Sequence, residues 1–136
     1  MPVYNNFKEQ LLRSAITDLS AGTTDVRVSL HGGYTPDIDL HAVFADVSAT
    51  ELTGTGYTAG GNPVGTKTVV QDNAADRGVF DGADVTWTGL SVGTPSHAII
   101  RDATANILIG YWPITTASNG GDYTLVFDAA GIVYIA

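Results

Sequence analysis

The stretch TKTVVQDNAADRGVFDGADVTWTGL, residues 66–90, decides the fold class. It contains three short runs rich in valine, threonine and aromatic residues, at 66–71, 77–81 and 83–90, and each run is bounded by Asn, Asp or Gly. β-Branched and aromatic side chains favour strands, whereas Asn, Asp and Gly favour turns. The stretch therefore predicts several short β-strands joined by turns.

The same pattern continues on both sides of this stretch. Before it, DVRVSL at 25–30 alternates Val26, Val28 and Leu30 with polar residues, which is the period of a half-buried strand. After it come four more runs of this kind: SHAIIRD at 96–102, NILIGYWPI at 106–114, DYTLVFD at 122–128 and GIVYIA at 131–136. Many short strands separated by turn residues predict a mainly β chain, folded as a sandwich or a barrel.

Two segments have helical character. In NNFKEQLLRSAITDL, apolar residues recur at steps of three and four, which predicts one short N-terminal helix at about residues 6–17. Asn6 followed by Glu9 matches a capping box at its start. The segment DIDLHAVFADVSATEL, 37–52, fits either a short helical turn or an irregular excursion.

Composition limits the classes of function. The chain has 136 residues without an internal repeat or a linker, so we expect a single domain over 1–136. Its 14 acidic and 6 basic residues give a net charge of −8, which disfavours nucleic acid and anionic membranes as partners. No signal peptide or segment of about 20 apolar residues is recognisable, so neither secretion nor membrane insertion is expected. The polar, weakly charged composition suits packing against other protein copies.

A glycine-rich segment at 51–69 resembles two nucleotide motifs in part. Gly54, Gly56 and Ala59 complete G-x-G-x-x-A, and Gly60 with the residues at 65–68 falls one residue short of a P-loop. Both motifs need a helix after the loop, because the helix N-terminus binds the phosphates. Here Asn-Pro and a strand-like run follow instead. We therefore expect a wide glycine loop anchored by Tyr57, and no cofactor.

The acidic residues and the histidines are the possible metal ligands of this chain, because it has no cysteine. Asp37, Asp39 and His41 would lie on one face of an extended segment, but a solvated acidic loop is the favoured interpretation. The aspartates of 72–84 lack the order of an EF-hand and are interpreted as turn residues. These four aspartates are Asp72, Asp76, Asp81 and Asp84. We expect no metal site.

Catalysis has equally little support. His31, His41 and His97 lack the spacing of zinc ligands, and the chain has no G-x-S-x-G motif. Ser96 and His97 are sequence neighbours, which is not the geometry of a catalytic triad. The chain is therefore not expected to be an enzyme.

The aromatic residues point to packing. Trp87 alternates with Val85 and is expected in the core. In the run 106–114 both faces are apolar, with Ile107, Ile109 and Tyr111 expected on one face and Leu108 and Trp112 on the other. Strands that are apolar on both faces need a cover, which the N-terminal helix, a second subunit or another protein could supply. The candidate interface residues are Trp112, Tyr111, Leu108 and Tyr134.

The chain resembles the small bacteriophage virion proteins that serve as capsid cement, or head decoration, subunits. The resemblance covers nearly the whole length, and its most specific part is ELTGTGYTAGG followed by GVFDGADVTW. The weaker parts are the opening YNNFKEQLL, then AIIRD, LIGYWP and the ending GGDYTLVFDAAGIVYI. The resemblance implies a jelly-roll-like antiparallel β-sandwich that oligomerises on a capsid lattice, without catalytic or cofactor residues.

This resemblance leads to one main hypothesis and two rivals. The main hypothesis is a cement protein, assembled in the host cytoplasm, which binds the major capsid protein and further copies of itself, as a dimer or trimer, on the outer surface of the capsid. The first rival is a structural protein of the phage tail or fibre. The second is a carbohydrate-binding β-sandwich module, in which Trp112 or the tyrosines would stack on sugar rings.

Overall fold

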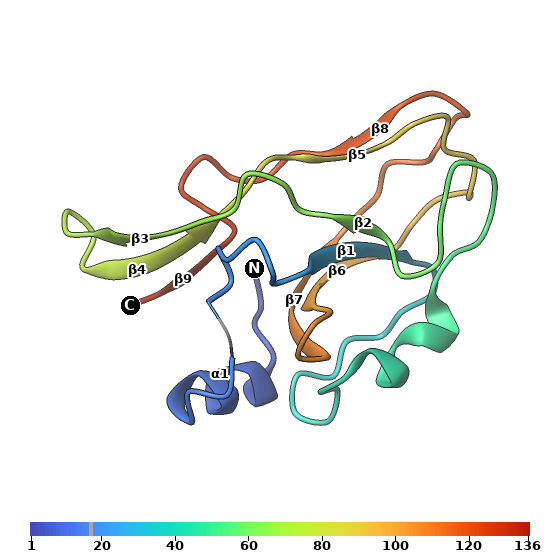
Figure 1. Ribbon diagram of the computed structural model, residues 1–136. Helices are drawn as coiled ribbons and strands as arrows, with labels where there is room; N and C mark the ends of the chain where they lie inside the picture. Colours follow the sequence, from blue (N-terminus) through green and yellow to red (C-terminus); the bar gives the residue numbers. More distant parts are fainter. Residues whose placement is uncertain (17) are drawn as a thin grey trace.

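The computed structural model describes residues 1–16 and 18–136, and it is mainly β, with one short α-helix near the N-terminus (Figure 1). The strands form antiparallel sheets consistent with a β-sandwich, which confirms the predicted fold class. In chain order the elements are α1 (Asn5–Leu12), β1 (Val26–His31), η1 (Phe44–Asp46), η2 (Ser48–Thr50), β2 (Asn62–Pro63), β3 (Thr68–Asp72), β4 (Arg77–Asp81), β5 (Val85–Trp87), β6 (His97–Asp102), β7 (Ile107–Pro113), β8 (Tyr123–Leu125) and β9 (Val133–Ile135).

Three sheets arise from these strands. They have the orders β2-β1-β6-β7, β3-β4-β9 and β5-β8, and every pair is antiparallel. Three of the pairs are nested in sequence, with β6 on β7, β5 on β8 and β4 on β9. Nested pairs of this kind arise when one long antiparallel hairpin folds over on itself. A jelly roll is built in this way.

The main core lies between the sheets and under α1. It includes Phe7 from α1, Phe80 from β4, Trp87 from β5 and Ile100 from β6, all buried. Trp87 is 1% exposed, as predicted, and its ring lies 6.4 Å from that of Tyr57.

A second, smaller core lies on the opposite face of the sheet β2-β1-β6-β7. Ile99 of β6 and Leu108 of β7 project into it, and Tyr4, Tyr34 and Val47 cover them. Tyr4 precedes α1, whereas Tyr34 and Val47 belong to the segment 32–52, which includes the predicted excursion 37–52 and is called the excursion below. The cover predicted from the apolar strands therefore comes from the chain itself, and chiefly from the excursion rather than from α1.

The N-terminal helix differs from its prediction. It ends at Leu12, because Ser14 has a left-handed backbone with φ of 53°, which stops helical hydrogen bonding. The predicted capping box is wrong: Asn6 lies inside the helix and accepts from Gln10, while the Glu9 carboxylate pairs with Arg13 at 2.8 Å. Thr17, the last residue of the predicted range 6–17, lies outside the described residues.

The excursion contains two single turns of 3-10 helix, η1 and η2, so it combines the two alternatives left open for 37–52, short helical turns within an irregular path. The Asp46 carboxylate accepts the backbone N–H groups of Ala42 and Val43 and so holds the entry to η1. These hydrogen bonds favour the ionised form and lower the pKa of Asp46. Within residues 1–16 and 18–136, no helix has the length and apolar character that crossing a membrane requires.

Candidate interaction surface

An apolar groove runs between α1 and the sheet β3-β4-β9. Its volume is about 390 Å³, and Phe7, Leu11 and Leu19 line one wall while Val69 and Phe80 line the other. Among the described residues that line the groove, Asp18 is the only ionisable one. An open groove with almost entirely apolar walls is typical of a surface that another macromolecule covers.

A second apolar groove continues the first around the end of α1. It is lined by Leu12, Tyr134 and the aliphatic stem of Lys8 among others, while Leu11 and Ile135 line both grooves. Leu12 is 89% exposed, although a leucine on an amphipathic helix is usually buried. The two grooves form one surface, which we call the α1/β9 surface.

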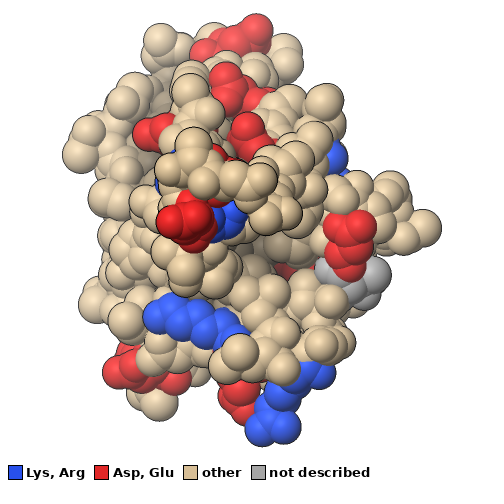
Figure 2. Space-filling model, turned by 90° about the vertical axis from the view of Figure 1, so that its left-hand side faces the viewer, with Lys and Arg blue, Asp and Glu red and all other residues tan. Residues whose placement is uncertain are grey.

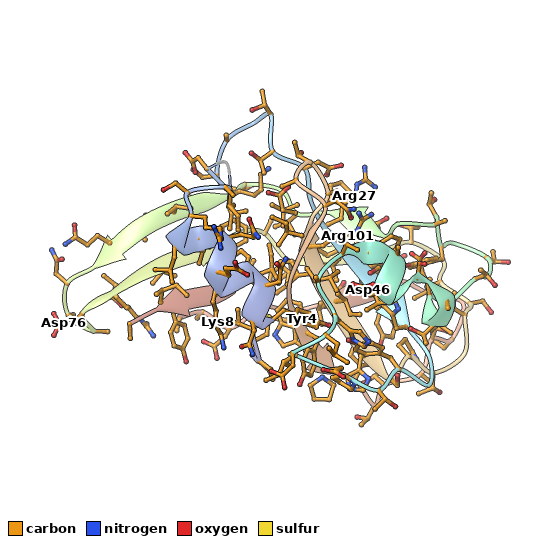
Figure 3. All side chains as sticks on the ribbon, turned by 90° about the horizontal axis from the view of Figure 1, so that it is seen from below. Tyr4, Lys8, Arg27, Asp46, Asp76 and Arg101 are labelled. Atoms are coloured by element: carbon orange, nitrogen blue, oxygen red, sulfur yellow. The ribbon has the colours of Figure 1, made fainter. Side chains whose placement is uncertain are left out.

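The sheet β3-β4-β9 projects beyond the rest of the molecule. In Figure 1 the β3–β4 hairpin extends to the left, and in Figure 3 its tip, with Asp76, lies well beyond α1. Val69 and Val70 are 52% and 53% exposed and lie on opposite faces of the hairpin. Figure 2 looks onto this end of the molecule and shows largely uncharged surface, with charged side chains in small separate groups.

Specific contacts fix the position of this sheet. At the base of β3, the Lys67 ammonium donates to the backbone carbonyls of Ala21 and Thr24. Farther out, Arg77 pairs with Asp72 at 3.0 Å, and its guanidinium lies 4.5 Å from the ring centre of Tyr134. The Arg77 guanidinium lowers the pKa of Asp72 by donating a hydrogen bond to its carboxylate. The Lys67 contacts thus attach the base of the sheet to the segment 21–24, whereas the Arg77 contacts join β3, β4 and β9 to one another.

The four predicted interface residues fall into two pairs: Trp112 and Tyr134 line one common pocket, whereas Leu108 and Tyr111 lie in the second core. Tyr134 is 52% exposed and lines the α1/β9 surface. Trp112 is half-buried, with its ring 5.6 Å from that of Phe127, and Tyr111 is half-buried against the second core. Leu108 is fully buried beneath the cover, so its side chain is not exposed on the surface of the subunit.

The predicted division of β7 into two faces is wrong. Ile109 and Trp112 pack on the main core, whereas Leu108 and Tyr111 pack on the second core. The cause is a β-bulge: Ile100 pairs with Gly110 and Arg101 with Leu108, so Ile109 has no opposite residue. One extra residue in the strand reverses the alternation beyond it.

The three histidines, predicted to have no metal-site spacing, gather around Tyr34. The ring centres of His31, His41 and His97 lie 5.8, 5.6 and 5.3 Å from that of Tyr34. The Nδ1 of His41 accepts the backbone N–H of Asp37, so this nitrogen carries no proton and the Tyr34 hydroxyl donates to it. The Tyr34 hydroxyl in turn accepts a hydrogen bond from the Tyr4 hydroxyl at 2.6 Å. Burial raises the pKa of both tyrosines. The cluster joins the excursion to the sheet.

The glycine loop has the anchor that its sequence predicts. The Tyr57 hydroxyl donates to the Glu51 carboxylate at 2.7 Å and accepts the backbone N–H of Leu30 at 3.0 Å. The backbone N–H of Gly60 also donates to Glu51, at 2.7 Å. The loop leads into β2 and not into a helix. A carboxylate of the chain itself therefore occupies a donor that a phosphate-binding loop would present to its ligand.

The acidic candidates are engaged in local structure. Asp37 accepts the backbone N–H groups of Asp39 and Leu40, and Asp39 accepts from the Asn5 amide. Asp72 accepts the N–H groups of two residues in the following turn, as predicted for a turn aspartate, whereas Asp84 accepts the N–H of the distant Phe127. Across the described part of the chain, no three His, Asp or Glu side chains are grouped so that they could hold a metal ion.

No family model, curated protein or solved structure matches this chain. The function must therefore be inferred from its residues and their arrangement.

Proposed function

We propose that this chain is a structural subunit of a bacteriophage head, a capsid cement protein. It binds the outer surface of the capsid and clamps neighbouring copies of the major capsid protein. Such a role depends on contact area repeated by symmetry and needs no reaction chemistry. The observation that carries the proposal is the α1/β9 surface, an apolar groove on a projecting sheet.

Three properties of the surface support a protein partner. Its walls are apolar, with Leu12 89% exposed and Ile135 49% exposed. It lies on α1 and β9, which the hydrogen-bonded sheet and the main core hold in place. It is open along its length, which suits a segment of protein better than an enclosed small molecule. The resemblance to phage cement proteins implies that this partner is the major capsid protein.

The sugar-binding rival lacks comparable support. A stacking platform needs an aromatic ring with a free flat face, and Phe127 packs against the Trp112 ring at 5.6 Å. Tyr34 and Tyr4 are buried within the second core. A glycan array with the purified chain tests this rival directly.

The first test is location and copy number. Heads and tails purified from the phage that encodes the chain are separated, and the protein is quantified by mass spectrometry. We expect it in heads, at a copy number comparable to that of the major capsid protein. A few copies per particle, found in the tail fraction, would support the tail or fibre rival and contradict the proposal.

The second test examines the surface. Heads lacking the protein are incubated with purified wild type, Leu12→Lys or Leu40→Lys, and bound protein is measured after sedimentation. Leu40 is the matched control, because it is 77% exposed but lies outside both grooves. We expect Leu12→Lys to weaken binding at least tenfold and Leu40→Lys to bind normally. Equal binding by both variants would exclude the α1/β9 surface as the contact.

A further inference from the structure

β3 is an edge strand whose outer side is open. It pairs with β4 over all five of its residues, and the order β3-β4-β9 leaves its other side without a neighbouring strand. Among the described residues, no backbone hydrogen bond reaches that outer side. An edge of this kind presents a row of backbone N–H and C=O groups. Another extended strand can form a continuous ladder of hydrogen bonds with this row.

Most of the usual protections of an edge strand are missing here, and the one charged residue of the strand, Asp72, is paired with Arg77 of the same copy. The strand reads TVVQD, without lysine, proline or glycine, and its pairing with β4 has no bulge. Four of its five residues are exposed, so no loop or helix of the described residues covers it. Natural proteins place charged residues, proline, bulges or a covering loop at an open edge that must remain unpaired. The absence of most of these features indicates that this edge has a partner.

An added strand would cover apolar side chains on both faces at once. Val69 shares a face with its cross-strand neighbour Phe80, and Val70 shares the opposite face with Val79. Val69 and Val70 are each about half exposed, at 52% and 53%. Each would gain a cross-strand neighbour from the added strand.

We propose that this partner is β3 of a second copy of the chain, paired antiparallel about a twofold axis at Val70. In this register Val70 lies opposite Val70 of the other copy, Val69 opposite Gln71, and Thr68 opposite Asp72. No two like charges meet directly. The result is one six-stranded sheet with the order β9-β4-β3-β3-β4-β9.

Charge explains why two copies approach along this edge. With a net charge of −8, copies repel each other over most of their surface. β3 carries one charge, on Asp72, and Arg77 of the same copy pairs with it at 3.0 Å. The edge is therefore a nearly neutral line of contact. This pairing is a property of the free chain, so its test needs no capsids and its outcome is independent of the proposed function.

The decisive experiment uses single cysteines, because the natural chain has none. Opposite residues of an antiparallel pair have Cα atoms about 4.5–5.5 Å apart, within reach of a disulfide. Val70→Cys should therefore cross-link the two copies under mild oxidation. Val69→Cys is the matched control, since the two Val69 Cα atoms would lie roughly 8–9 Å apart, too far for a disulfide. Their equal exposure makes random collision equally frequent for both variants.

Sedimentation measures the same pairing without cross-linking. We expect the wild type to show a dimer whose population rises with concentration, and Val70→Lys to dissociate at least tenfold more readily. Val126→Lys, at a 71% exposed valine outside β3, should behave as the wild type. A wild type that stays monomeric at several hundred micromolar, a trimer, or equal cross-linking of the Val69→Cys and Val70→Cys variants would each overturn the proposal.

Discussion

Ile109 and Trp112 lie on the same face of β7 and pack against the same core, although three positions separate them. The bulge at Ile109 makes this possible, and it turns Tyr111 toward the second core. The bulge also lies where the N-terminal segment crosses β7, since Val3 forms an isolated bridge with Gly110. One irregular position thus decides how both cores and the chain terminus are arranged.

The first prediction concerns Trp112→Ala. Because the Trp112 ring packs on the main core and on Phe127 but remains partly exposed, we expect a loss of about 2 kcal/mol in unfolding free energy, below the roughly 3–5 kcal/mol for a fully buried tryptophan. Urea unfolding checks the value, with Trp87→Ala as the fully buried reference. A loss as large as that of Trp87→Ala, or none, would contradict the packing described.

The second prediction concerns Gly110→Ala. A Cβ atom at this position would lie 2.6 Å from the Pro2 carbonyl oxygen and would also collide with Met1. The N-terminal segment must then move away, so the N–H groups of Tyr4 and Tyr111, which bond Ile109 and Pro2, should exchange faster with solvent. Hydrogen exchange measures this change. Gly78→Ala is the control, because nothing lies within 4 Å of its added Cβ, and it should leave exchange at Tyr4 unaltered.

The third prediction is loss of stability in acid. His31 is fully buried, with Ser29 bonded to its Nε2 and Thr50 to its Nδ1, and no carboxylate among the described residues bonds to the ring. Burial lowers the pKa of His31 to about 4, with a smaller lowering from His97 and Arg101, and burial also lowers the pKa of His97. The unfolded chain, with histidine pKa near 6.5, binds protons first. The neutral His31 therefore contributes its full share to the free energy of unfolding above pH 6.5. This share is lost as pH falls toward 4, which lowers the free energy of unfolding by up to about 3 kcal/mol.

Urea midpoints at pH 4.5 and 7.5 test this acid dependence. His31→Gln supplies one donor and one acceptor without titrating, so the difference between its two midpoints should be smaller than that of the wild type. If the variant keeps the full difference, another group causes the acid sensitivity.

The fourth prediction concerns the anchor of the glycine loop. Tyr57→Phe removes both the acceptor of the Leu30 N–H and the hydroxyl donor to Glu51. We expect a loss of about 1–3 kcal/mol, because partly buried polar groups are left without partners. Tyr134→Phe is the control, since its ring is half exposed, and it should cost little. Thermal unfolding of both variants gives the comparison, and equal losses would argue against the anchor.

The strands were largely predictable from sequence, because the alternation that predicts them is local. β4 matches its predicted range, 77–81, and β1, β6 and β7 agree within a few residues. β2 was missed, since Asn62 and Pro63 carry no strand signal and form a strand only by pairing with β1. The bulge in β7 was also missed, because the N-terminal segment that crosses Gly110 is more than a hundred residues away in sequence.

The candidate surface could be predicted only in part. Helical spacing suggested that Leu12 faces the protein, but α1 stops there and leaves the side chain in solvent. Tyr134 is predicted because the run GIVYIA, 131–136, is apolar on both faces like the run 106–114. The grooves themselves depend on the distance between α1 and β9. Tertiary packing determines this distance, so a local sequence pattern cannot predict it.

The nested order of the strand pairs also has a consequence for the path of folding. The β6–β7 turn closes over four residues, 103–106, and the Asp102 carboxylate accepts two N–H groups within it. Once this hairpin forms, the loop that must close to pair β5 with β8 is shorter, so its entropic cost is smaller. The pairing of β5 with β8 then lowers the entropic cost of pairing β4 with β9. We therefore expect the sheet that carries the apolar groove to be completed last. Its exposed apolar side chains are then assembled into a binding surface only after the core beneath them has formed, which limits the time in which partly folded chains could aggregate through it.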